Sequence, residues 1–190
     1  MVTAARQPPL PPIEILDGIS PGIFAATMAP LFEGAPRFLG RLANARPFGS
    51  LDELFERARQ IAHGMPVAEQ LELIDAHPRL GAPPASVSAL SFVEQGYERD
   101  AAESAARDAM ADRDRVAAAL DRLNAAYEDR FGFRYCVFVN GRPRAELLPE
   151  MQAALDAGRP SELRRALDAV IDIARDRAAR LGSAATEATP

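Results

Sequence analysis

Apolar side chains recur every three or four positions along most of this 190-residue chain, which is the spacing of one buried helix face. The helical pattern starts at Ile13, and its clearest early run ends at Gly34. The apolar members of that run are Ile23, Phe24, Met28, Leu31 and Phe32. A shorter run at Phe38, Leu39 and Leu42 stops before Pro47 and Gly49. We therefore expect short helices in this first part of the chain.

Two further helices are predicted between Ser50 and His77. Ser50 and Glu53 have the spacing of a capping box, which predicts where the first of them begins. Its expected buried stripe consists of Leu51, Leu54, Phe55, Ala58, Ile61 and Ala62. Gly64 and Pro66 separate it from the second helix, which should turn Val67, Leu71 and Ile74 inward.

The second half of the chain predicts a loop, more helices and one short extended run. Glycine and prolines indicate a loop over 79–89, and 91–110 is compatible with a helix. A longer helix follows, with Val116, Leu120, Leu123, Ala126 and Tyr127 on one side. Tyr135–Val139 is the only run that favours β structure, and helices are expected over about 143–157 and 161–182.

One strand cannot form a sheet, so these elements predict an all-α, single-domain bundle of about seven or eight helices. At most one short extended segment is expected within it. The helical domain should span residues 13–182. Residues 1–12 contain four of the 16 prolines and should form a flexible arm, and residues 183–190 should form a loose tail.

The composition excludes several kinds of chemistry. All 22 basic residues are arginine, so neither a lysine Schiff base nor a Walker lysine is available. With only His63, His77 and Cys136, a zinc site built from nitrogen and sulfur ligands is not expected. The net charge of −5 argues against nucleic-acid or membrane-surface partners. We identify no metal site, although the composition leaves an all-carboxylate Mg²⁺ or Ca²⁺ site open. If the protein is an enzyme, we expect it to use carboxylates, a histidine and arginines without a cofactor.

The location expected from these features is the cytoplasm. A single cysteine excludes an internal disulfide and suits a reducing compartment. No apolar run approaches the roughly 18 residues of a membrane-spanning helix.

His77 and Arg177 are polar residues at positions where the pattern calls for an apolar one. His77 ends an amphipathic helix, and Pro78 turns the chain into a loop there. The histidine therefore either faces a cleft or caps the helix. Arg177 lies three residues after Ala174 and four before Leu181, on the inward stripe of the last helix. It must bind an anion, form a structural salt bridge or reach the surface.

Two other segments have both a structural and a functional interpretation. Ser91 and Glu94 have capping-box spacing, which favours a helix start, but Glu94 can also face the same cleft as His77. Arg130–Phe133 ends a helix with two aromatic residues around Gly132. Either both rings pack in the core, or the main chain that follows lines a pocket and offers its N–H and C=O groups to a ligand.

Several of these motifs together resemble the OHCU decarboxylase family, which acts on 2-oxo-4-hydroxy-4-carboxy-5-ureidoimidazoline (OHCU) in the conversion of urate to allantoin. The resemblance covers roughly Ile15 to Leu181. The motifs that carry it are Phe32-Glu33…Pro36, Ala45–Leu51, Ile74-Asp-Ala-His77-Pro78-Arg-Leu-Gly81, Ser91-x-x-Glu94-Gln95, Leu123-Asn124-x-x-Tyr127-x-x-Arg-Phe-Gly-Phe133 and Ile173-Ala174-x-x-Arg177. Each motif is weak alone, but their order and spacing make the match fairly specific.

The resemblance implies a helical, cofactor-independent enzyme that yields (S)-allantoin and CO₂. It implies that His77 and Glu94 are catalytic and that Arg177 binds an anionic ureidoimidazoline. Substrate contacts are implied for Ser91 and Pro78, and for the main chain at Val137, Phe138 and Val139. Members of such families are monomers or homodimers, and the sequence does not decide between them.

Two departures from the family pattern leave other functions open. The loop between His77 and Glu94 is shorter than is common, and the region around 98–114 is longer. These differences bear on substrate access and assembly. The alternatives are a non-catalytic helical ligand-binding protein on the same fold, or a lyase for a related ureide.

Overall fold

The computed structural model describes residues 8–97 and 107–186, and these residues are all-α, as the sequence predicts. They form nine α-helices and two short 3-10 helices, and none of them is in a β-strand. None of the described helices is long and apolar enough to span a membrane. The chain packs into two compact units. The terminal unit joins the residues up to Ala76 with those from Leu167 onward, and the central unit spans His77–Ala166.

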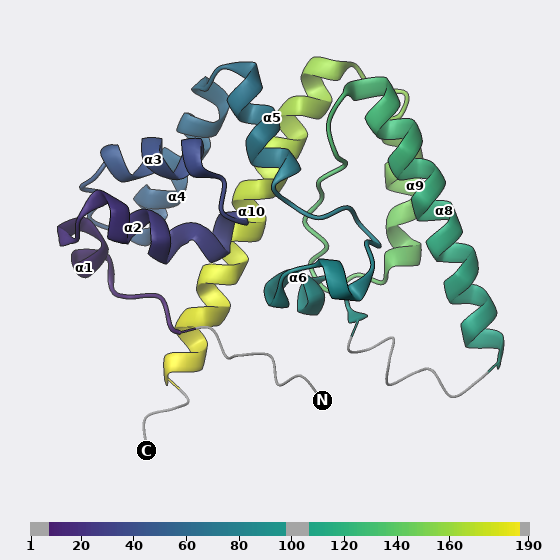
Figure 1. Ribbon diagram of the computed structural model, residues 1–190, viewed down its shortest axis with the longest axis horizontal. Helices are drawn as coiled ribbons and strands as arrows, with labels where there is room; N and C mark the ends of the chain where they lie inside the picture. The colour runs from purple at the N-terminus through teal and green to yellow at the C-terminus, as the bar shows by residue number, and fades with distance from the viewer. Residues whose placement is uncertain (1–7, 98–106, 187–190) are drawn as a thin grey trace. The chain divides into compact units, whose positions relative to one another are not determined.

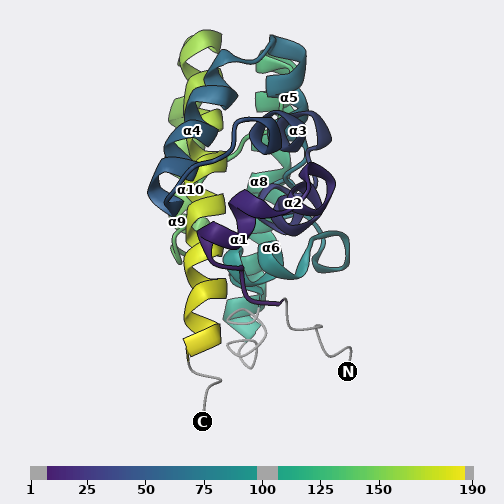
Figure 2. The ribbon, with the colours of Figure 1, turned by 90° about the vertical axis from the view of Figure 1, so that its left-hand side faces the viewer.

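The terminal unit is built from the first five α-helices and the later part of the last helix (Figure 1). They are α1 (Ile13–Gly18), α2 (Pro21–Met28), α3 (Pro36–Asn44), α4 (Leu51–Gly64), α5 (Val67–Asp75) and α10 (Arg159–Thr186), with the 3-10 helix η1 (Ala29–Phe32) after α2. Both views show α4 alongside the part of α10 that belongs to this unit (Figures 1 and 2). Residues 8–12 precede α1 without regular structure, and residues 1–7 of the predicted arm lie outside the described residues.

The start of α4 agrees with its sequence signal. Ser50 is the N-cap, and its side-chain oxygen accepts a hydrogen bond from the Glu53 backbone N–H at 3.1 Å. Four of the predicted stripe residues are buried: Leu54, Phe55, Ala58 and Ala62. Leu51 is exposed instead, because it is the first residue of the helix.

The buried face of α5 agrees with the prediction at Ile74 and differs from it elsewhere. Val67 is 50% exposed, whereas Gln70, Leu73 and Ile74 are buried. The Gln70 side chain donates to the carbonyls of Ala62 and His63 at 3.1 and 3.0 Å. These carbonyls lie in the last turn of α4, where the helix itself supplies no donor. A polar residue therefore occupies a buried position because it completes the neighbouring helix end.

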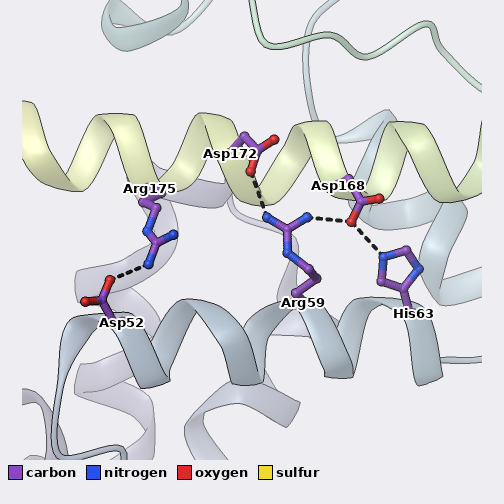
Figure 3. A network of polar contacts seen from close by, with 6 residues as sticks. All are labelled: Asp52, Arg59, His63, Asp168, Asp172 and Arg175. Carbon is purple, nitrogen blue, oxygen red and sulfur yellow. Dashed lines mark hydrogen bonds and ion pairs between the residues drawn. The ribbon is translucent and has the colours of Figure 1, made fainter.

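Polar side chains join α4 to α10 within the terminal unit (Figure 3). Arg59 of α4 pairs with both Asp168 and Asp172 of α10, which lie one turn apart. His63 contacts Asp168 at 2.9 Å, and Arg175 pairs with Asp52. The pKa of Asp168 is lowered: burial acts to raise it, but the hydrogen bonds from His63 and Arg59 outweigh that effect.

The central unit contains the remaining helices. They are the 3-10 helix η2 (Pro84–Ser86), α6 (Ala89–Glu94), α8 (Arg107–Phe131), α9 (Arg144–Ala154) and the first residues of α10. Its core includes an aromatic cluster in which the Tyr127 ring packs against Phe131, Phe133 and Tyr135, with centroids 4.5, 5.7 and 5.1 Å away. Both rings of the Phe-Gly-Phe motif are therefore in the core, as the structural interpretation of that motif expects.

Three element boundaries predicted for the second half of the chain differ in the structure. Ser88, not Ser91, is the N-cap of α6, so the capping-box interpretation of Ser91 and Glu94 is wrong. The helix α6 ends at Glu94, and residues 98–106 of the predicted helix over 91–110 lie outside the described residues. The last helix extends to Thr186, beyond the predicted end at Gly182. Residues 183–186 of the predicted loose tail at 183–190 are therefore helical, and residues 187–190 lie outside the described residues.

Candidate functional site

His77 lies two residues beyond the end of α5. The helix therefore ends close to the His77-Pro78 step, as the sequence predicts. Only 4% of the His77 residue is exposed, and its Nε2 atom is buried. An unperturbed histidine titrates near pH 6.5, so a histidine can exchange protons near neutrality. Its burial limits competition from bulk water around the ring.

The loop that begins at His77 is irregular, yet side chains of the central unit hold its main chain at successive positions. Arg134 Nη1 donates to the His77 carbonyl at 2.8 Å. Asn124 Nδ2 donates to the Leu80 carbonyl at 2.9 Å, and the Tyr97 hydroxyl donates to the carbonyl of Ala82. These bonds satisfy carbonyls that neither a helix nor a sheet serves. The loop is thus fixed by its surroundings.

Gln95 connects this loop to α6. Its side-chain oxygen accepts from the Gly81 backbone N–H at 2.7 Å, and its amide nitrogen donates to the Arg79 carbonyl at 3.3 Å. Gln95 is the C-cap residue of α6 and follows Glu94 directly. The element that carries Glu94 and the loop that starts at His77 are therefore bonded to each other.

Ser91 and Glu94 occupy different environments on α6. Ser91 is almost fully buried, with 3% of the residue exposed, whereas Glu94 is partly exposed. Ser88 caps the helix, so capping does not explain why Ser91 is buried. A hydroxyl and a carboxyl one turn apart can both serve a ligand bound at the end of α6.

The segment 134–139 is neither helix nor strand, although its composition favours β structure. Tyr135, Cys136 and Val139 are buried, and Val137 and Phe138 are partly exposed. Burial raises the pKa of the Tyr135 hydroxyl, and this hydroxyl has no hydrogen-bond partner among the described residues. The run therefore pairs with no strand among the described residues, as the sequence predicts for a single isolated segment.

Arg177 lies in the terminal unit and is buried, with 1% of the residue exposed. Its Nη1 atom donates to the carbonyls of Pro30 and Leu31 at 3.0 and 3.3 Å. Its Nη2 atom forms an ion pair with Glu33 Oε1 at 2.9 Å. The structural salt bridge expected as one alternative therefore exists, and it lies at the turn where Glu33 adopts a left-handed backbone with φ of 49°.

Sequence reasoning assigned no role to Gln95, Asn124 or Arg134, although all three bond the His77 loop. Asn124 carried a usable signal, because it lies between Leu120 and Tyr127 on the predicted buried face of a helix. A polar residue at such a position needs a partner. Gln95 and Arg134 gave no comparable signal, since neither lies on an apolar stripe that the sequence predicts.

Comparison with known proteins places this architecture in one family. Residues 18–179 match the family model described as OHCU decarboxylase. The chain is 30% identical over 160 residues to the 2-oxo-4-hydroxy-4-carboxy-5-ureidoimidazoline decarboxylase of Haloferax volcanii, covering 82% of this chain and 87% of that one. It is 31% identical over 153 residues to the uric acid degradation bifunctional protein PucL of Bacillus subtilis, of which it covers only 29%.

Two solved structures share the fold. A crystal structure of OHCU decarboxylase in the presence of (S)-allantoin aligns with a TM-score of 0.59 and 24% identity over 79% of this chain and 93% of that one. A crystal structure of (S)-allantoin synthase aligns with a TM-score of 0.61 and 18% identity over 90% of this chain and 53% of that one.

These matches define an all-α enzyme of the carboxy-lyase class. The chain belongs to the OHCU decarboxylase family, and the names of its relatives connect that family with urate degradation.

Proposed function

We propose that this chain decarboxylates OHCU to (S)-allantoin and CO₂ without a cofactor. The observation that carries the proposal is the bonding of the His77 loop to the end of α6 through Gln95, in a chain that belongs to this family. That bonding supports a joint role for His77 and Glu94, which come from elements separated by a loop.

The substrate itself makes a cofactor unnecessary. When the bond to the departing carboxylate breaks, its electron pair moves into the adjacent ring C=N bond, and CO₂ leaves. When a substrate has no such internal electron sink, the enzyme can supply one in a cofactor such as pyridoxal phosphate, which is held through a lysine. This chain has no lysine, so a reaction that supplies its own sink suits it.

His77 and Glu94 act as the acid/base pair in this proposal. One group holds the substrate hydroxyl or ring nitrogen, and one delivers a proton to a single face of the ring carbon, which gives the (S) product. The imidazole of His77, which is buried, and the carboxyl of Glu94, which is partly exposed, are both groups that can serve as a general acid or base. The assignment of the two steps between them stays open.

The remaining contacts bind and orient the substrate. Pro78 and Ser91 flank the two catalytic groups in sequence and shape the pocket around them. The main chain at Val137, Phe138 and Val139 supplies hydrogen bonds to the polar ring and ureido groups. Arg177 binds the anionic substrate, because a guanidinium offers a planar pair of donors that fits a carboxylate.

The test uses OHCU generated freshly from urate by urate oxidase and the upstream hydrolase. Circular dichroism follows the growth of the (S)-allantoin signal with wild type, with His77→Asn and with Glu94→Gln. We expect rapid growth with wild type and its near-complete loss in both variants, whose far-ultraviolet spectra stay unchanged. His63→Asn is the matched control, since it removes the only other histidine.

Each contrary result has a distinct meaning. A folded wild type that does not exceed the spontaneous decay of OHCU would contradict the proposed reaction and favour a binding protein. A panel of other ureides would then identify a related lyase. Normal turnover by His77→Asn would contradict only the assignment of the catalytic histidine.

A further inference from the structure

The main chain of residues 136–139 lies in neither a helix nor a sheet, so its carbonyls need other donors. Two arginines supply them from different elements. Arg165 of α10 donates from Nη1 to the Cys136 carbonyl at 2.9 Å. Arg142 donates from Nη2 to the Phe138 carbonyl at 2.9 Å and from Nε to the Val139 carbonyl at 3.1 Å.

Arg142 reaches these carbonyls because the chain turns back on itself just before it. Asn140 and Gly141 have φ values of 49° and 70°, and the Arg142 backbone N–H bonds the Val139 carbonyl at 3.0 Å. Two consecutive positive φ angles are the mark of a type I′ turn, which suits Asn-Gly. Because of this turn, the Arg142 side chain lies next to the residues that precede the turn and reaches the carbonyls of Phe138 and Val139.

The two arginines differ in what else they contact. Arg165 also bonds Glu162 at 2.9 Å and lies over the buried Tyr135 ring, 4.6 Å from its centroid, and its side chain is 30% exposed. Arg142 has one further partner, Glu150 of α9, at 2.9 Å, and its side chain is 39% exposed. Arg142 can therefore be replaced with less damage to the core than Arg165.

The backbone N–H groups of Val137, Phe138 and Val139 donate to no residue that the structure describes. A carbonyl shares its peptide plane with the N–H of the next residue. The bond of Arg165 to the Cys136 carbonyl therefore fixes the direction of the Val137 N–H, and the bond of Arg142 to the Phe138 carbonyl fixes that of the Val139 N–H. A backbone N–H that is already oriented binds a polar or anionic group without reorganising on binding.

We infer that Arg142 is a positioning residue, which orients the Phe138–Val139 peptide and with it the Val139 N–H for substrate. This inference rests on the proposed function, in which the main chain at Val137–Val139 contacts the substrate. Arg142 acts through the two carbonyls, and it needs no contact of its own with the substrate.

The test compares Arg142→Ala and Arg142→Lys with two controls in the full chain. Glu150→Ala removes the ion pair of Arg142 but leaves its carbonyl bonds. Arg164→Ala removes an exposed arginine of the same charge from α10. The readouts are kcat and KM for OHCU, together with hydrogen exchange of peptides that cover 134–142.

Arg142→Ala should raise KM roughly tenfold with kcat within about twofold of wild type, because a lost binding contact raises KM alone. Arg142→Lys should lie between, since one ammonium cannot replace a fork that spans two carbonyls. Exchange in 134–142 should be faster in Arg142→Ala than in wild type. Both controls should match wild type. A purely structural role would lower the amount of folded enzyme without changing KM.

The contrary outcomes separate the two proposals. An unchanged KM for Arg142→Ala, or an equal KM rise in Glu150→Ala, would overturn the inference. If wild type did not decarboxylate OHCU, the proposed function would fail, and exchange would still decide whether Arg142 orders the segment. Unaltered exchange in Arg142→Ala would then overturn the positioning role as well.

Discussion

Gln95 and Gly81 are joined by a hydrogen bond of 2.7 Å, from the Gly81 backbone N–H to the Gln95 side-chain oxygen. The same amide donates to the Arg79 carbonyl at 3.3 Å. Gly81 lies four residues after His77, and Gln95 lies one residue after Glu94. One side chain therefore fixes the loop that carries one proposed catalytic group to the helix that carries the other.

Replacing Gln95 should impair catalysis more than folding. Gln95→Ala removes both loop bonds, and a displacement of about 1 Å in a catalytic group can lower the rate on the order of 100-fold. We expect kcat per folded enzyme to fall about 10- to 100-fold. Gln95→Glu keeps the acceptor for Gly81 and should lose less. Active-site titration with steady-state kinetics measures this, with exposed Gln152→Ala as the control. Equal kcat in Gln95→Ala and Gln152→Ala would disprove the positioning role.

Gly81 should not tolerate a side chain. Its φ is +81°, and a Cβ there would lie 2.8 Å from Leu120 Cδ1, which is buried in α8. Gly81→Ala should therefore lower the free energy of unfolding by about 1–3 kcal/mol, measured by urea denaturation. Gly182→Ala in α10 meets no atom within 4 Å and should raise it by up to about 1 kcal/mol. A neutral Gly81→Ala would mean that the loop adjusts easily.

Arg177→Lys should separate the two roles of this arginine. Lysine keeps the charge but cannot bond Pro30, Leu31 and Glu33 at once. The free energy of unfolding should therefore fall by about 1–3 kcal/mol. If Arg177 also binds substrate, KM rises strongly in the enzyme that remains folded. Denaturation and KM are measured on the same sample. A loss of stability with unchanged KM would identify a purely structural arginine.

Acid should weaken the contact between α4 and α10. The lowered pKa of Asp168 means that its contribution is complete above the unfolded value, about 3.9, and is lost as pH falls through the lower folded value. The side chain is 44% exposed, so the effect should stay below about 1 kcal/mol. Asp168→Asn should flatten the decline of stability below about pH 4. A decline as steep as that of the control Asp156→Asn would contradict this assignment.

The sequence by itself determined the helical class, the break at His77-Pro78 and the extended run before Asn140-Gly141. Those features depend on local rules, namely apolar spacing, proline geometry and turn residues. The sequence also identified Arg177 as a buried charge, because the stripe of α10 required an inward side chain at that position.

Only the tertiary structure decided which residues hold the site together. Ser88 rather than Ser91 caps α6. On α5, the polar Gln70 is buried whereas the apolar Val67 is exposed. Gln95 and Arg142 satisfy carbonyls of irregular segments, and such partners follow from how the chain folds in space. A hydrogen bond to a loop carbonyl leaves no periodic trace, because every residue has the same carbonyl and only packing selects which donor reaches it.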